Sequence, residues 1–510
     1  MTTVGDATRK LATRPLLHVS MLFIAIFAML LAGSLFFPLV SGADEAAHYV
    51  YSAAVARGQA GTLEPTVPAR IANLHHLAAC IAFHPDITAA CQEPLGIASN
   101  AAVLSQTNAG LYNPVFYAWT GLGSLILPTE YGLYVARALA ALFTSLFLAW
   151  GLSLTWRRAR TPWPTVAAAL LLTPMTIYVG MVLNPSAWEI ASLFAVTVSG
   201  YHVITSTSKS WGEHHSLLLA AGSVLIVTRG LSPLFLVISA VALLLTVPWS
   251  QTLHVLRRRS TWVIAIVLAM VALGSVGWVL LHGTNYVGVE RPAGLRAGLR
   301  GISVFYSNYH EQVTQMYGNL GWLDLPSPQI LSILWVLLAG GFVLVSFAAV
   351  IGRKRIAILF AFAVCTLLPG ILAGMQWSGF GWQGRYTLPL VALLLGLCAW
   401  TTDAAFDPVA REDALTSRLL SSFRVIYPGF FALGAIVIAI RAAHRYSVGD
   451  PAPWLASPTW TPPVAMPFLA VVFLAGIVVL TASLAARPVG SIKPTPDLDS
   501  AHSTSGPGRG

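Results

Sequence analysis

The sequence has too few charged residues for a water-soluble protein. Only 9% of its 510 residues are Asp, Glu, Lys or Arg, while 56% are hydrophobic. A soluble domain ordinarily carries about 25% charged residues. The mean hydropathy of +0.72 agrees with this deficit. The composition therefore excludes a chain that folds in water alone, and lipid must be the solvent for much of it.

Cysteine is also scarce, with four in the chain. Cys365 and Cys398 lie in apolar runs, where a small thiol is ordinary core packing. Cys80 and Cys91 share one segment that we expect to face an oxidising compartment, so we predict a disulfide between them.

No spacing of cysteine and histidine matches a known zinc pattern. His75, His76 and His84 lie near the predicted disulfide. A metal site there is the less favoured alternative, and we predict none.

Long apolar runs are abundant, and several reach the roughly 20 residues that a membrane-spanning helix needs. The first run is too long for a cleaved signal peptide, so we interpret it as a retained span. We predict an all-α integral membrane protein of about twelve transmembrane helices, with the count least secure around 214–249. The spans fall near 16–40, 131–156, 163–183, 186–206, 214–228, 231–249, 261–282, 328–351, 355–373, 386–401, 425–441 and 464–485.

The basic residues indicate orientation rather than nucleic-acid binding, despite a formal charge of +10. Most of them lie in short clusters between alternate apolar runs, and the positive-inside rule places these clusters and both termini in the cytoplasm of a plasma-membrane protein. The predicted organisation is a tail at 1–15, a polytopic domain at 16–485, outer loops at 41–130, 283–327, 374–385 and 442–463, and a disordered tail at 486–510.

The segment 112–128 is apolar enough to suggest another span. Counting it as a span would move the cluster Arg157, Arg158 and Arg160 to the outer side, against the positive-inside rule. Its aromatic residues suit the headgroup region. We therefore predict an interfacial helix within a long first outer loop.

Polar residues at the outer ends of spans are the candidates for chemistry. Asp44, Glu45 and His48 follow the first span. In a helix starting at Ser41, both carboxylates lie within one turn of the imidazole, which is typical of an acid/base cluster. The alternative is structural, with Ser41 and Asp44 forming a pair like a capping box.

Other outer ends carry weaker candidates. Glu189 lies one turn into a span, where a carboxylate usually faces the bundle interior; the alternative is a helix cap with an interfacial Trp. Arg229 is best explained as a basic residue that snorkels to the interface. Asp324 contacts substrate or caps the next helix, and the sequence does not separate these.

Arg385 is the sharpest candidate, because it begins a span on the side that the positive-inside rule disfavours. It follows Gln383 and Gly384 and precedes Tyr386. A guanidinium fork suits a pair of phosphate oxygens. The alternative is an internal salt bridge to Asp44 or Glu45.

Four motifs in register resemble a known family. The segments 44–49, 184–189, 321–324 and 383–389 together are similar to the bacterial membrane family called domain of unknown function two-one-four-two. One departure is Ser186-Ala187, where that family more often has Asp-Gly, which puts a role for the Ser186 side chain in doubt.

That family in turn resembles C-type glycosyltransferases, which use polyprenyl-phosphate sugars on the outer face of the membrane. The resemblance implies a catalytic base just after the first span, at Asp44 or Glu45. It also implies that the helix beginning near Tyr112 is an element of that superfamily. The expected substrate-binding positions are Tyr49, Asn184, Glu189, Trp322 and Asp324.

The chemistry agrees with this implication, because sugar transfer needs a base for the acceptor hydroxyl and a cation for the departing phosphate. Asp44 would be the base, tuned by Glu45 and His48, and Arg385 would hold the phosphate with Gln383 and Tyr386. We expect no obligatory metal, with a divalent cation left open. Arginine greatly outnumbers lysine, which hints at an actinobacterial source with an envelope glycan or lipoglycan as acceptor. Alternatives are a transporter or flippase, and a lipid-linked-oligosaccharide ligase or polymerase.

Overall fold

The structure is a computed structural model that describes residues 14–92, 95–96, 100–208, 210–283, 294–375, 382–406 and 414–486. Within these residues, nine helices are long and apolar enough to cross a membrane. They are α2 (Pro15–Phe36), α7 (Gly132–Arg158), α10 (Ser186–Thr205), α14 (Arg259–His282), α17 (Gln329–Ala349), α18 (Arg353–Met375), α19 (Leu388–Ala405), α20 (Ala414–Ser447) and α21 (Met466–Ala485). The chain is a multi-pass membrane protein.

A bent pair of helices is a candidate for a tenth span. α8 (Trp163–Leu171) and α9 (Pro174–Met181) meet at 59° and together pass the same test. Side chains satisfy backbone carbonyls at the break, since the Thr176 hydroxyl donates to the Leu171 carbonyl at 2.8 Å. The Trp335 indole likewise donates to the Leu170 carbonyl at 2.9 Å. Such partners make a broken helix tolerable at membrane depth.

The two remaining predicted spans are also helical but short. They are α11 (Glu213–Thr228) and α12 (Ser232–Leu245). Every predicted span therefore coincides with a helix or a bent pair, and nine or ten of them qualify as crossings by length and composition among the described residues.

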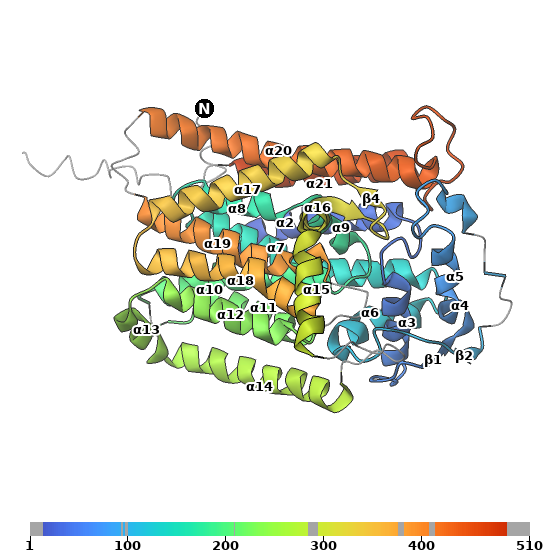
Figure 1. Cartoon of the computed structure of the whole chain (residues 1–510), viewed down its shortest axis with the longest axis horizontal. Helices are drawn as coiled ribbons and strands as arrows, with labels where there is room; N and C mark the ends of the chain where they lie inside the picture. The colour runs from blue at the N-terminus through green and yellow to red at the C-terminus, as the bar shows by residue number, and fades with distance from the viewer. Residues whose placement is uncertain are drawn as a thin grey trace, which may run out of the picture.

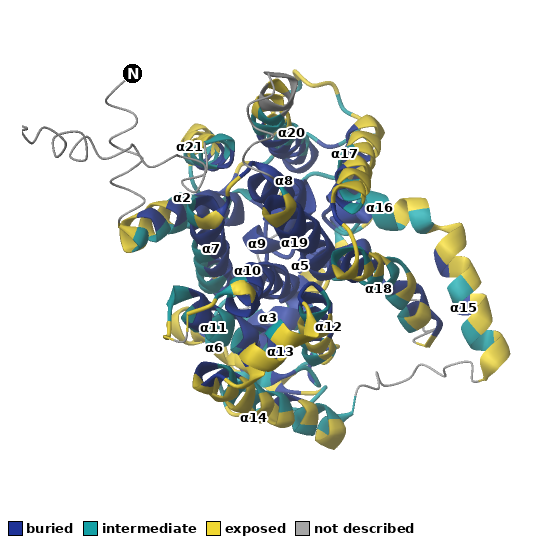
Figure 2. Ribbon diagram, turned by 90° about the vertical axis from the view of Figure 1, so that its left-hand side faces the viewer, coloured by how far each residue is buried: buried dark blue, intermediate teal, exposed yellow. Residues whose placement is uncertain are grey.

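The bundle has an inner and an outer set of helices. α10 and α19 are almost entirely buried within the protein, with 94% and 89% of their apolar windows covered, whereas α14 is only 17% covered. Figure 2 shows buried helices in the middle of the bundle and exposed faces on α14, α17 and α20 around it. The exposed faces are rich in leucine and valine, as expected for lipid contact.

A layer of short elements covers one end of the bundle, here called the α3–α6 end (Figure 1). It contains α3 (Glu45–Val55), β1 (Thr66–Pro68), α4 (Ala69–Ala72), α5 (Leu74–Ala79), η1 (Ala89–Cys91), β2 (Ala102–Leu104) and α6 (Pro114–Ile126). β1 and β2 pair antiparallel, with Thr66 opposite Leu104. α13 (Trp249–Leu256) lies at the opposite end.

α6 corresponds to the predicted interfacial helix at 112–128. It has 13 residues, too few to cross a bilayer. The Asn113 side chain caps it by accepting from the Val115 amide at 3.1 Å. The Trp119 indole ties it to α7 by donating to the Leu139 carbonyl at 2.8 Å.

A second group of short elements joins α14 to α17. It consists of α15 (Leu295–Ser307), α16 (Tyr309–Gly318), β3 (Asn319–Leu320) and β4 (Leu325–Pro326), and η2 (Gly384–Tyr386) precedes α19. Figure 1 shows α15 running across the direction of the spans. β3 and β4 form a small antiparallel hairpin whose turn contains the predicted Trp322 and Asp324.

Some sequence predictions lie outside the described residues. They concern residues 1–13, parts of the loops at 41–130, 283–327 and 374–385, and residues 487–510. Cys80 and Cys91 are described, and they form the disulfide that the sequence analysis favoured.

Candidate functional site

Asp44 begins the site, at the start of α3. Its backbone is left-handed, with φ of 65°, a conformation that Asp tolerates better than most residues. The helix begins at Glu45 rather than Ser41, and the Asp44 side chain makes no capping hydrogen bond. The Ser41 hydroxyl is buried and makes none either. The capping explanation of Asp44 is therefore wrong, and its half-exposed carboxylate is available for other contacts.

Glu45 points the other way, into a buried ion pair with Arg137 of α7. Both side chains are fully buried. Arg137 Nε and Nη2 each donate to the Glu45 carboxylate at 2.7 Å. The remaining Arg137 donors reach the backbone carbonyls of Ser34, Phe37 and Pro38.

The Glu45 carboxylate also receives the Leu183 amide at 2.7 Å and the Gly42 amide at 3.2 Å. Its oxygens are thus occupied within the protein. This arrangement ties the end of α2, the start of α3 and α7 together. It leaves Asp44 as the carboxylate that can meet a substrate.

His48 lies one turn after Asp44 and is buried. Its Nδ1 is 3.0 Å from the Tyr117 hydroxyl. Burial lowers the pKa of the imidazole to about 3. The charge of Asp44 acts against this shift, and the charges of Arg229 and Arg385 add to it. His48 is therefore neutral at physiological pH, and its imidazole hydrogen-bonds to Tyr117 rather than acting as a cation beside Asp44.

Arg385 lies in η2 and joins the site from the other half of the chain. Its Nη2 is 2.7 Å from Asp44 Oδ2, which realises the internal salt bridge considered from the sequence. The Arg385 side chain is almost completely buried. Gly384 allows this position, since a Cβ there would lie 2.3 Å from the Gln312 carbonyl oxygen, and the Gly384 amide donates to Gln315 Oε1 at 2.9 Å.

Arg229 is the site residue that the sequence analysis missed. It turns inward, and its Nη2 donates to Asn184 Oδ1 at 3.3 Å. Its guanidinium carbon lies 4.7 Å from the centre of the Tyr386 ring, and that of Arg385 lies 5.2 Å from the same ring. The signal was present, because Arg229 follows a predicted span on the same disfavoured side as Arg385.

These contacts form a continuous series from Asn184 through Arg229, Tyr386 and Arg385 to Asp44. Several buried polar atoms on or next to these residues have no hydrogen-bond partner among the described residues, which is uncommon in native proteins and calls for an explanation at each position. They are Asn184 Nδ2, Ser186 Oγ, Arg229 Nε, Gln383 Oε1 and Arg385 Nε. Two guanidinium groups and unpaired donors suit an anionic ligand.

Glu189 lies beside this series but is engaged by another residue. It is buried, and the Ser232 hydroxyl donates to its Oε1 at 2.6 Å. Arg229 is close enough to interact with it electrostatically. Glu189 therefore helps to balance the charge of Arg229 from within the bundle.

The other predicted substrate contacts hold the backbone in place. Asp324 accepts from the Trp322 amide at 2.9 Å and lies 3.5 Å from Arg445 Nη2, which closes the β3–β4 turn. The Trp322 indole donates to the Val40 carbonyl at 3.0 Å. The Tyr49 hydroxyl donates to the Thr129 carbonyl at 3.2 Å. Trp322 as a whole is half-buried.

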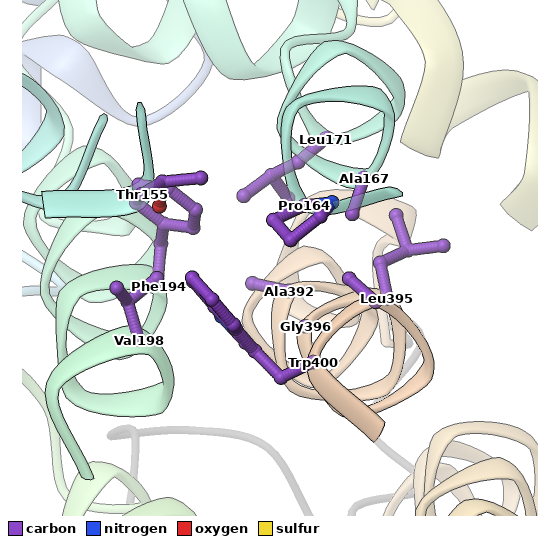
Figure 3. A pocket seen from close by; sticks show the side chains of 11 residues that line it. Thr155, Pro164, Ala167, Leu171, Phe194, Val198, Ala392, Leu395, Gly396 and Trp400 are labelled. Atoms are coloured by element: carbon purple, nitrogen blue, oxygen red, sulfur yellow. The ribbon is translucent and has the colours of Figure 1, made fainter. Parts of the chain in front are cut away.

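Two other places were considered as sites. Within the described residues, no three His, Cys, Asp or Glu side chains cluster as metal ligands. A small pocket between α7, α8, α10 and α19 is lined by residues such as Leu171, Phe194 and Trp400 (Figure 3). No charged side chain lines it, so it offers nothing for acid/base or phosphate chemistry.

Comparison with known proteins identifies a family of membrane proteins. No curated protein matches the chain. Residues 27–394 match a family described as "Predicted membrane protein (DUF2142)". The match spans from α2 into α19 and includes Asp44, Asn184, Arg229 and Arg385. The chain therefore belongs to the DUF2142 family of membrane proteins.

Proposed function

We propose that the protein is a glycosyltransferase that moves a sugar from a polyprenyl-phosphate donor to an envelope glycan or lipoglycan. The observation that carries the proposal is the direct pairing of the half-exposed Asp44 carboxylate with the buried Arg385 guanidinium at 2.7 Å. A carboxylate that can take a proton thus lies beside a cation that can hold a phosphate.

In the proposed reaction, the acceptor hydroxyl oxygen forms a bond to the anomeric carbon of the donor sugar. The bond between that carbon and the phosphate oxygen breaks, and its electron pair leaves with the polyprenyl phosphate. Asp44 takes the proton of the acceptor hydroxyl as general base. Arg385 and Arg229 stabilise the charge that develops on the departing phosphate.

Donor binding also accounts for the present pairing of Asp44. Arg385 pairs with Asp44 through Nη2, and its Nε has no partner among the described residues. A bound phosphate would engage the Arg385 fork and compete with Asp44 for it. The carboxylate would then be freed to accept a proton when the donor is in place.

The proposed location is the outer face of the plasma membrane, with both termini in the cytoplasm. The distribution of basic residues supports this orientation. The disulfide between Cys80 and Cys91 supports it too, because such bonds persist in oxidising compartments. The site would then face the compartment in which polyprenyl-phosphate sugars are consumed.

A transporter would place its charges near the bilayer midplane, around broken helices. The break between α8 and α9 is instead lined by Leu172 and Thr173, and the Thr173 hydroxyl donates to the Met316 carbonyl at 3.0 Å. Packing within the protein therefore accounts for the break between α8 and α9. A ligase for longer lipid-linked glycans would use the same Asp44 and Arg385 chemistry and differs only in donor length.

The test is a deletion strain analysed for envelope glycans and for lipid-linked sugars. The proposal predicts loss of one glycan linkage together with accumulation of a polyprenyl-phosphate sugar. Accumulation of a lipid-linked oligosaccharide would identify a ligase. Unchanged glycans and unchanged lipid-linked sugars would contradict both.

A further inference from the structure

Strained backbone is concentrated beside Asp44. Among the described residues, the non-glycine residues with left-handed φ are Val40 at 51°, Asp44 at 65°, Phe83 at 63° and Leu323 at 65°. For a β-branched residue such as Val40 this is a genuine outlier. Backbone strain of this kind persists at functional sites, where surrounding structure enforces it.

The three segments that carry this strain contact one another. The Trp322 indole donates to the Val40 carbonyl at 3.0 Å. The Ala43 amide donates to the Gly321 carbonyl at 3.3 Å. The Phe83 and Trp322 rings lie 5.9 Å apart at 63°. An aromatic pair is therefore held next to the turn that presents Asp44.

Phe83 is exposed, although its loop is firmly held. Its exposed fraction is 66%, at a site inside the disulfide between Cys80 and Cys91. Arg445 donates to the carbonyls of Ile81 and Ile87 on either side of it. The loop thus holds an uncovered ring in a fixed place.

Lipid contact does not explain this exposure. The loop lies beyond the end of α20, because the Pro85 carbonyl accepts from the Asp450 amide at 2.8 Å and α20 ends at Ser447. His84 and Asp86, which flank the ring, are also exposed. Polar neighbours and a position past the span favour a ligand from water.

We infer that Phe83 and Trp322 form an aromatic platform that binds a sugar ring of the acceptor. The inference rests on the proposed function and adds the acceptor subsite to it. The C–H face of a sugar ring is apolar and packs against aromatic faces, while its hydroxyls stay free at the edge. Arg229 and Arg385 bind the donor phosphate in the proposed reaction. The aromatic pair would bind the acceptor sugar and direct one of its hydroxyls toward Asp44.

The test is saturation-transfer NMR on the full chain in nanodiscs, with methyl glycosides of glucose, galactose, mannose and arabinose as probes. At least one glycoside should receive saturation at its C–H protons in the wild type and in Asp44→Asn. Phe83→Ala should abolish the signal, whereas Phe83→Tyr keeps an aromatic ring at this position and should retain the signal. Trp454→Ala is the matched control, since Trp454 is 61% exposed on the segment after α20; it should leave the signal unchanged.

The platform proposal is contradicted if the wild type shows no saturation transfer to any glycoside. It is also contradicted if Phe83→Ala keeps the wild-type signal. A lipid adduct after irradiation of a protein carrying p-benzoylphenylalanine in place of Phe83 would contradict it too and would assign the ring to the membrane. The two proposals fail separately. Glycoside binding without any sugar transfer by the wild type rejects the transferase and keeps the platform, whereas transfer with an unchanged acceptor KM in Phe83→Ala rejects the platform alone.

Discussion

Removing Arg137 should destabilise the protein far more than removing an exposed ion-pair partner. Arg137 and Glu45 are both fully buried, and Arg137 makes five hydrogen bonds, two to Glu45 and three to backbone carbonyls. In Arg137→Met the Glu45 charge stays buried without its partner. Breaking a buried pair in this way costs about 3–5 kcal/mol of unfolding free energy.

The matched control is Arg441→Met, which breaks the pair between Arg441 and Asp450. These side chains are 26% and 40% exposed, so solvent screens the pair and its loss should cost about 0–1 kcal/mol. The double variant Glu45→Leu/Arg137→Met should recover part of the loss, because no unpaired charge then remains. The Gly42 and Leu183 amides would still lose an acceptor, which prevents full recovery.

The assay is reversible unfolding in bicelles by steric trapping, with variants compared at equal lipid composition. A loss below about 1 kcal/mol in Arg137→Met would contradict this expectation, since a buried carboxylate cannot lose its paired cation at so little cost. Such a result would also return Glu45 to the list of candidate bases.

Four further outcomes are expected. Peptide mapping without reduction should recover the Cys80–Cys91 crosslink, and alkylation of both thiols would contradict it. In intact cells, single cysteines at the exposed positions Glu64 and Leu104 should react with membrane-impermeant maleimide. A cysteine at His254 should not react, and the reverse pattern would overturn the orientation. Arg385→Lys keeps the charge but loses the fork, so it should lower kcat/KM for the donor; an unchanged kcat/KM would exclude phosphate binding there. The pKa of His48 falls from 6.5 to about 3 on folding. The contribution of neutral His48 to the free energy of unfolding should therefore be complete above pH 6.5 and should decline as pH falls toward 3. His48→Gln should remove this part of the decline when unfolding is measured against pH.

The sequence allowed much of the fold to be predicted, because a membrane span is a local property. A run of apolar residues needs no knowledge of its neighbours to be recognised as a helix in lipid. A short helix at α6 in place of a span was also predictable, since counting the segment as a span contradicted the charge distribution. The bend between α8 and α9 was not predicted, because it depends on partners such as Trp335 from a distant helix.

The candidate site was predictable only in part. Asp44 and Arg385 were found because polar residues at the disfavoured end of a span need a reason to be there. The sequence left two possible ion-pair partners for Arg385, Asp44 and Glu45. Asp44, which lies 341 positions away, is the one that pairs with it. The partner of Glu45 was not found, because Arg137 lies 92 residues away inside a span. Arg229 was set aside as a snorkelling residue, since nothing local shows that its side chain turns inward.

The central claim is that Asp44 is the base of a sugar transfer. The most direct measurement is incorporation of labelled sugar into envelope glycan by membranes of a deletion strain that carries wild-type protein or Asp44→Asn at matched level. The substitution keeps the size of the side chain and an oxygen that can still accept from Arg385, but it cannot take up the proton. Transfer should fall by about 10²–10⁴-fold with the protein still folded, and transfer near the wild-type rate would contradict the account.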